Sequence, residues 1–191
     1  MIYIRKGIFE TNSSSSHSIV MMKTDKPLET TDKNWHVDDS GIMDFWYEDD
    51  LEFGRSPFEL LTDWYGRLRY CIATYSGKQN KIDELEEICR RRVSGFKAFK
   101  FKENHYGDGL DQGYIDHQSL GLLEHALRKF NTSLEEFIFN DRYIVVIDGD
   151  EYCVFDTLIE TEMFNKDSIE QIASASYDLE EMYFEENGEE Q

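Results

Sequence analysis

The stretch Arg142–Phe155, RYIVVIDGDEYCVF, has the pattern of a β-hairpin. Apolar residues dominate both halves, and Asp148-Gly149 between them is the type of pair that forms a two-residue turn. Because such a turn joins antiparallel strands, the stretch predicts antiparallel pairing in the last third of the chain.

Several upstream segments also have the composition of strands. In FKAFKFK, Phe99 and Phe101 alternate with Lys100 and Lys102, which predicts a strand with one buried face and one wet face. The DDSG turn signal separates two further short strands. The predicted strands are 1–9, 18–23, 35–37, 42–48 and 96–102.

A pair of helices is predicted between these strands. Ser56, Pro57 and Glu59 form a capping box with proline at the first helical position, and an apolar stripe follows until Gly77. A second helix is expected over 78–94, so the two would form a helical hairpin with an apolar seam.

Shorter helices are expected from Ser119, from the capping box at Ser133, and over the C-terminal stretch from Asp167. Strands and helices do not alternate regularly along the chain. The sequence therefore predicts an α+β fold with a mostly antiparallel sheet, one domain over 1–186 and an acidic tail over 187–191.

Charge is distributed unevenly along this chain of 191 residues, whose net charge is −20. Residues 131–191 hold 18 acidic and 2 basic side chains, a net charge of −16. Residues 67–102 hold 10 basic and 4 acidic side chains, a net charge of +6. A strongly negative field repels nucleic acid and attracts basic partners, although it also serves simply to keep a surface solvated.

A run of four serines lies near the start, in FETNSSSSHS. It falls between two predicted strands, with Arg5 and Lys6 before it and His17 closing it. Backbone amides and hydroxyls that converge in a tight loop bind phosphate, with an arginine as the charged partner. The candidate phosphate- or nucleotide-binding residues are Arg5, Thr11, Asn12, Ser13, Ser14, Ser15, Ser16 and His17.

Three interpretations of this serine loop stay open. It is a turn held by its own side chains, an anion or nucleotide site, or a Ser–His nucleophile pair with His17 as the candidate catalytic residue. Neighbouring residues on an extended chain point to opposite faces, which argues against Ser16 or Ser18 as the partner of His17. No glycine-rich nucleotide motif is present, and no particular cofactor is indicated.

The segment IRKGIFETNSSSSHSI, together with YIDHQS at 114–119 and FIFNDRYIVVIDGD at 137–150, resembles a group of small accessory proteins carried by phages and Gram-positive bacteria. The serine motif is the most specific part of the resemblance. It implies a setting, the cytoplasm of a bacterial host cell, and assigns no catalytic role.

A second constellation lies in HYGDGLDQGYIDH. Imidazoles and carboxylates this dense are possible metal ligands, but the calcium-loop pattern fails and glycine and aspartate also form ordinary loops. The candidate ligands are His105, Asp108, Asp111, Asp116 and His117.

A basic cluster is interleaved with aromatic residues in RRRVSGFKAFKFK. Such a segment either follows a nucleic-acid backbone or pairs with the acidic part of the same molecule, and the excess of acid nearby favours the second. The cluster consists of Arg90, Arg91, Arg92, Lys97, Lys100 and Lys102.

The acidic last third is the remaining candidate. Glu180, Glu181, Glu185 and Glu186 fit one exposed side of a helix, and a dense carboxylate surface can imitate nucleic acid. We therefore expect a protein that inhibits a host defence or nucleic-acid-handling protein with a basic surface. The alternative is a nucleotide- or phosphate-binding enzyme built on the serine loop with Arg5 and His17.

The sequence has no cysteine motif and no apolar run long enough to span a membrane. The three cysteines, Cys71, Cys89 and Cys153, are widely spaced and indicate neither a disulfide framework nor a zinc knuckle. The longest apolar run, YIVVI, is far shorter than the ~20 residues that span a bilayer. We expect no membrane partner.

Overall fold

Strand β7 (Tyr143–Asp148) lies inside a four-stranded sheet with the order β4-β7-β1-β8. The computed structural model describes residues 18–23, 36–53, 59–102, 114–115, 122–148 and 172–175. β7 pairs antiparallel with β1 (Ser18–Lys23) and with β4 (Glu59–Leu61), and β1 pairs antiparallel with β8 (Ile172–Ala175). The first strand of the predicted hairpin is confirmed as β7, whereas the second half of the hairpin lies outside the described residues.

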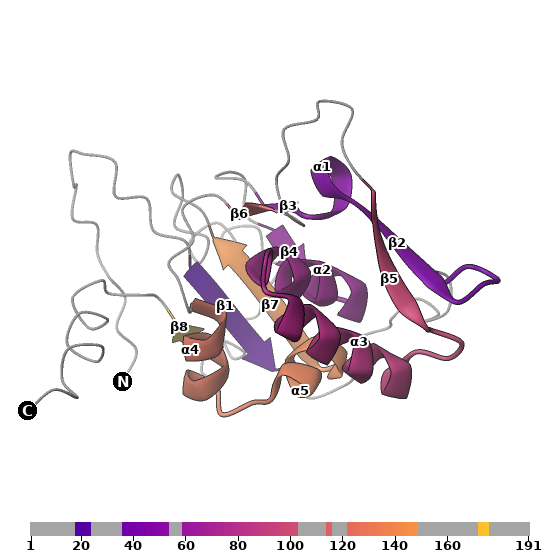
Figure 1. Ribbon diagram of the computed structural model, residues 1–191. Coiled ribbons are helices and arrows are strands. Elements are labelled where there is room, and N and C mark those ends of the chain that lie inside the picture. The colour runs from indigo at the N-terminus through magenta and orange to yellow at the C-terminus, as the bar shows by residue number, and fades with distance from the viewer. Residues whose placement is uncertain are drawn as a thin grey trace, which may run out of the picture.

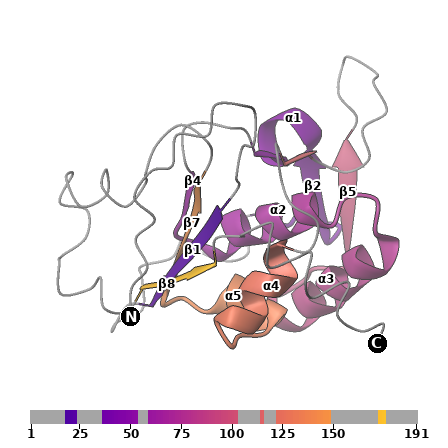
Figure 2. The same cartoon turned by 90° about the vertical axis from the view of Figure 1, so that its left-hand side faces the viewer.

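The register of this sheet places apolar side chains on one face. Ile19 pairs with Ile147 and Met21 with Val145, and all four are buried. Figure 2 shows the described helices on a single side of the sheet, which is the side on which the core forms. Buried residues from strands and helices join in one hydrophobic cluster.

The other strands form two parallel ladders of two strands each. β2 (Ile42–Trp46) pairs with β5 (Ala98–Lys102), and β3 (Glu52–Phe53) pairs with β6 (Tyr114–Ile115). The β2–β5 ribbon stands at one end of the molecule (Figure 1). The α+β class is confirmed, but the prediction of a mostly antiparallel sheet is wrong. Between β2 and β5 the chain forms a helix pair, and this long crossover returns it beside β2 in the same direction.

The helix pair consists of α2 (Trp64–Thr74) and α3 (Gln79–Arg92). The prediction that the first helix starts at Ser56 is wrong, because Glu59–Leu61 is strand β4 and pairs with β7. The helix begins only at Trp64, where the Asp63 side chain accepts a hydrogen bond from the Gly66 amide at 2.8 Å. The prediction of α3 is confirmed to within two residues at each end.

Three short helices complete the described structure: α1 (Tyr47–Asp50), α4 (Leu122–Lys129) and α5 (Leu134–Phe139). The predicted cap of α5 is confirmed, since Ser133 Oγ accepts a hydrogen bond from the Glu136 amide at 3.1 Å. The helix predicted over the C-terminal stretch is wrong at 172–175, where the chain is strand β8 on the edge of β1. The strand predicted at 35–37 is also wrong for His36 and Val37, which lie in a turn before β2.

Candidate functional site

Most of the predicted site residues lie outside the described residues. This holds for the whole serine loop with Arg5 and His17, for the five candidate metal ligands between His105 and His117 and for the acidic residues at 180–186. Within the described part of the chain, no group of histidine, cysteine and carboxylate side chains could hold a metal ion. The basic cluster is the predicted site that the structure describes completely.

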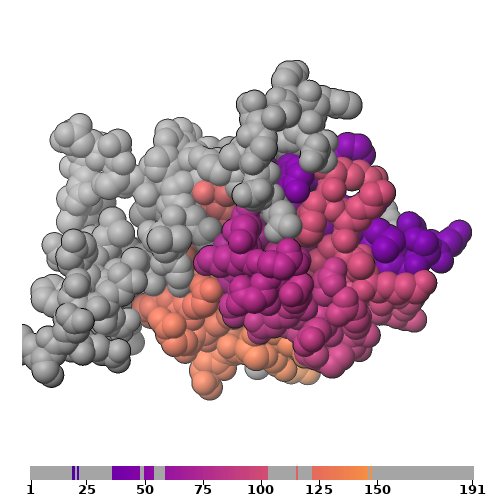
Figure 3. Space-filling model, in the orientation of Figure 1, coloured from indigo at the N-terminus to yellow at the C-terminus, as the bar shows by residue number. Residues whose placement is uncertain are grey.

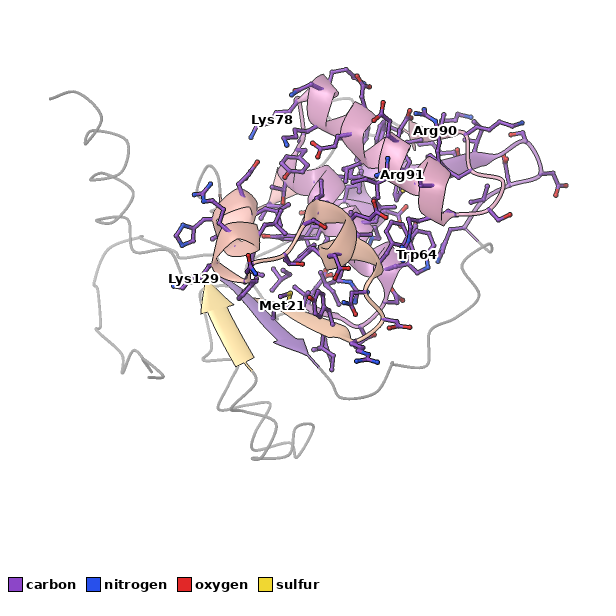
Figure 4. All side chains as sticks on the ribbon, turned by 90° about the horizontal axis from the view of Figure 1, so that it is seen from below. Met21, Trp64, Lys78, Arg90, Arg91 and Lys129 are labelled. Atoms are coloured by element: carbon purple, nitrogen blue, oxygen red, sulfur yellow. The ribbon has the colours of Figure 1, made fainter. Side chains whose placement is uncertain are left out.

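The three arginines of the cluster occupy the last turn of α3. Figure 4 labels Arg90 and Arg91 on this helix. Arg91 Nη2 lies 2.8 Å from Glu135 Oε2, and Arg92 Nη1 lies 3.6 Å from Glu135 Oε1. Glu135 belongs to the acidic segment 131–191, so two of the three arginines pair with that segment as expected. Glu135 also raises the pKa of Arg91, through its hydrogen bond to the guanidinium.

Arg90 has a different set of contacts. Its guanidinium binds Glu86 one turn earlier on α3 and donates to the Lys97 carbonyl at 3.0 Å. Glu86 also accepts the Phe99 amide at 2.9 Å, so this carboxylate fastens α3 to the start of β5. The arginine therefore helps to build the fold at this position.

Lys100 and Lys102 lie on β5, and Lys97 directly precedes this strand. Phe99 is buried and Lys100 is exposed, as the alternation predicts. Lys97 Nζ donates to the Ser40 carbonyl at 2.7 Å. Lys102 Nζ lies 2.5 Å from Asp44 Oδ2 and 4.7 Å from the centre of the Trp46 ring. Most cations of the cluster are thus engaged by groups of the same chain.

A polar hollow of about 450 Å³ opens beside these arginines, between the end of α3 and α5. Three carboxylates and one guanidinium contribute to its wall, so its lining is negative. The lining residues are Arg92, Ser133, Glu135, Glu136, Phe139, Asn140 and Asp141. In the space-filling view the surfaces of α3 and α5 adjoin (Figure 3).

A buried arginine donates hydrogen bonds to the backbone of the segment that lines this hollow. Arg67 on α2 is 0% exposed, and its guanidinium donates to the Ile138 carbonyl at 2.9 Å and to the Asn140 carbonyl at 3.1 Å. It also donates to the Tyr143 carbonyl at 2.8 Å. Since these bonds hold the chain on both sides of Asp141, the turn that carries this carboxylate is fixed in place.

A series of aromatic contacts runs from the hollow to the first residue of α2 and on to His36. The Arg92 guanidinium lies 5.4 Å from the centre of the Phe139 ring, and Phe139 stacks on Trp64 at 5.3 Å. Trp64 in turn meets the ring of His36 edge-on at 5.8 Å. Phe139, the aromatic residue that lines the hollow, is therefore a buried member of the hydrophobic core.

The two described cysteines offer no nucleophile. Cys71 and Cys89 are both buried and unbridged. Burial raises the pKa of the Cys71 thiol well above its ordinary value and that of Cys89 to about 12. Thiolate chemistry at these two positions is thereby disfavoured.

Neither the hollow nor Arg67 was foreseen from the sequence. In the sequence Arg67 is an ordinary charged residue of the predicted helix, and three of its four carbonyl partners are 71 to 76 positions away. For the hollow, the sequence contains one local signal, the capping box at Ser133, which correctly predicts where α5 begins.

No helix of the described residues is both long and apolar enough to cross a membrane. No known protein family, curated protein or solved structure matches this chain.

Proposed function

We propose that this protein acts by binding: it presents an acidic surface to a host protein with a basic surface, and so inhibits a defence or nucleic-acid-handling protein inside the bacterial cell. A phage or mobile element is the setting that the sequence resemblance implies. The observation that carries the proposal is the pairing of Arg91 and Arg92 with Glu135. Glu135 thereby offsets part of the positive charge of the basic cluster, and the net charge of the whole chain is −20.

The charge balance supports the same proposal. The segment 131–191 has a net charge of −16, and Glu135 is one of its 18 acidic residues. Complementary potentials raise association rates and suppress wrong partners, and they weaken as salt screens them. Such an inhibitor competes with nucleic acid for one basic groove.

The test is capture from a bacterial lysate on the immobilised full-length chain, followed by competition. Retained proteins should be basic, should leave the resin as salt is raised above about 150 mM, and should be displaced by duplex DNA. Immobilised bovine serum albumin, another acidic protein, is the control for unspecific ion exchange. Retention of the same proteins by both resins, or retention that neither salt nor DNA reverses, contradicts the proposal.

A second candidate function is favoured by the serine run between Arg5 and His17, directly before β1. Here the protein is a nucleotide- or phosphate-binding enzyme. Thermal shift of the wild type against His17→Ala, with mononucleotides and dinucleotides as probes, tests it. A ligand at a hundredfold excess over its Kd should stabilise the wild type by roughly 2.7 kcal/mol. If no nucleotide moves the melting temperature, this second function is wrong.

A further inference from the structure

The hollow between α3 and α5 already shows how this chain holds a guanidinium. Arg92 lies over the Phe139 ring at 5.4 Å and points Nη1 towards Glu135 at 3.6 Å. An aromatic face below and a carboxylate beside are the two groups that best recognise this cation. One arginine of the chain itself therefore occupies one side of the hollow.

Two further residues that line the hollow, Glu136 and Asp141, carry carboxylates. Glu136 Oε2 accepts a hydrogen bond from the side-chain Nδ2 of Asn140 at 3.1 Å, which leaves its second oxygen for another donor. Among the described residues, the Asp141 carboxylate makes no hydrogen bond or ion pair, and it interacts electrostatically with the buried Arg67 guanidinium. Both residues line the hollow, which gathers their negative charge around one space.

The wall is held rigid before anything binds. The chain enters α5 through the cap at Ser133, and Asn140 Oδ1 accepts the Arg142 amide at 3.0 Å to close the turn after the helix. Arg67 fixes the carbonyls of Ile138 and Asn140 from inside the core. A preorganised site loses less entropy when it binds, so more of the energy of each new contact is kept as affinity.

We infer that this hollow binds an arginine side chain of a basic protein partner, which lies beside Arg92 and donates to Glu136 and Asp141. The inference rests on the proposed function and names the contact through which it acts. A guanidinium fits better than an ammonium, because its planar fork of five N–H donors matches acceptors on several sides of the hollow. An anion is disfavoured by three carboxylates against one guanidinium.

The first experiment uses a small probe on the full-length protein. Arginine blocked at both ends is titrated while amide chemical shifts are followed, and blocked citrulline, which has the same shape without the charge, is the control. We expect saturable shifts confined to residues near 133–141, and an affinity for citrulline at least about tenfold lower. Equal binding of the two probes, or shifts that lie elsewhere, would overturn the inference.

Variants separate the hollow from the general negative field. Glu136→Gln with Asp141→Asn removes two charges from the wall, and the probe should lose its binding. Asp83→Asn with Glu84→Gln removes the same number of charges from the exposed first half of α3 and should keep it. If both double variants lose binding equally, the hollow has no special role and the inference is wrong.

The captured partner distinguishes this inference from the proposed function. If a basic partner binds the wild type and the hollow variant equally well, the proposed function stands and the hollow is not its contact site. If blocked arginine binds in the hollow but no basic partner is displaced by DNA, the site stands and the proposed function fails.

Discussion

Arg67 and Tyr143 lie 76 positions apart in the chain, and a guanidinium N–H of the first donates to the carbonyl of the second at 2.8 Å. The same side chain reaches the carbonyls of Ile138 and Asn140 and, at 3.4 Å, that of Leu61. It thus connects α2 to β4, to the end of α5 and to β7. Few side chains other than arginine carry enough donors for this position.

Replacing Arg67 with methionine should destabilise the protein severely. The new side chain fills much of the volume but leaves buried carbonyls without donors, and each costs about 1–3 kcal/mol. We expect the free energy of unfolding in urea to fall by about 3–5 kcal/mol. Arg128→Met, at an exposed position in the last turn of α4, should change it by less than about 0.5 kcal/mol. Similar losses in the two variants would show that Arg67 is not a structural centre.

The position of Arg67 illustrates which parts of the fold could be predicted. Local signals were sufficient for the cap at Ser133, for the stripe of α3 and for the alternation of β5, because each depends on residues within one turn or one strand. The hollow depends on α3, α5 and the turn after α5 meeting in space. No local sequence pattern predicts that these three segments pack against one another.

The two helix predictions that are wrong, at 59–61 and at 172–175, also failed because of long-range contacts. A good capping box at Ser56 predicted a helix, but β7 offers Glu59–Leu61 a partner strand, and that long-range pairing prevails. Likewise, Ile172–Ala175 has a helical pattern in isolation and becomes a strand beside β1. Propensity is a weak guide wherever an open sheet edge competes for the same residues.

Two glycines near the base of the β2–β5 ribbon should differ in their tolerance of alanine. Both have positive φ, +90° at Gly41 and +78° at Gly95. A Cβ at Gly41 would lie 2.6 Å from the Gly95 carbonyl oxygen, whereas a Cβ at Gly95 meets nothing within 4 Å. Gly95→Ala should cost about 1–2 kcal/mol for its backbone alone, and Gly41→Ala clearly more, because overpacking adds about 1–3 kcal/mol. Thermal unfolding measures both, and a Gly95→Ala that is as damaging as Gly41→Ala would contradict the close approach of Gly41 to the Gly95 carbonyl.

His36 should make stability depend on pH near neutrality. Its ring stacks on Tyr65 with centres 3.5 Å apart, and burial lowers its pKa below 6.5, although Asp63 and Asp50 act in the opposite direction. As pH falls through about 6.5, the unfolded chain takes up the proton before the folded one, so the free energy of unfolding decreases. The penalty is absent well above pH 6.5 and reaches its full size below the pKa of the folded state.

The measurement is urea unfolding at about pH 7.5 and about pH 5.5, for the wild type and for His36→Phe. Phenylalanine keeps an aromatic ring on Tyr65 but cannot be protonated. The variant should therefore lose less stability than the wild type between the two pH values. Equal losses would assign the pH dependence to other titrating groups, such as the remaining four histidines.

The basic cluster should not bind nucleic acid, although its sequence is that of a nucleic-acid contact. Arg91 and Arg92 are paired with Glu135, Lys102 is paired with Asp44, and the whole chain carries a net charge of −20. At about 150 mM salt, labelled single-stranded and duplex DNA should show no saturable change in anisotropy with the wild type. Glu135→Gln, which frees the arginines, should behave like Asp83→Asn, which removes one charge elsewhere on α3. Saturable binding by the wild type that Lys100→Gln weakens, with a salt slope reduced by about 1, would instead establish a direct phosphate contact and contradict the acidic-inhibitor proposal.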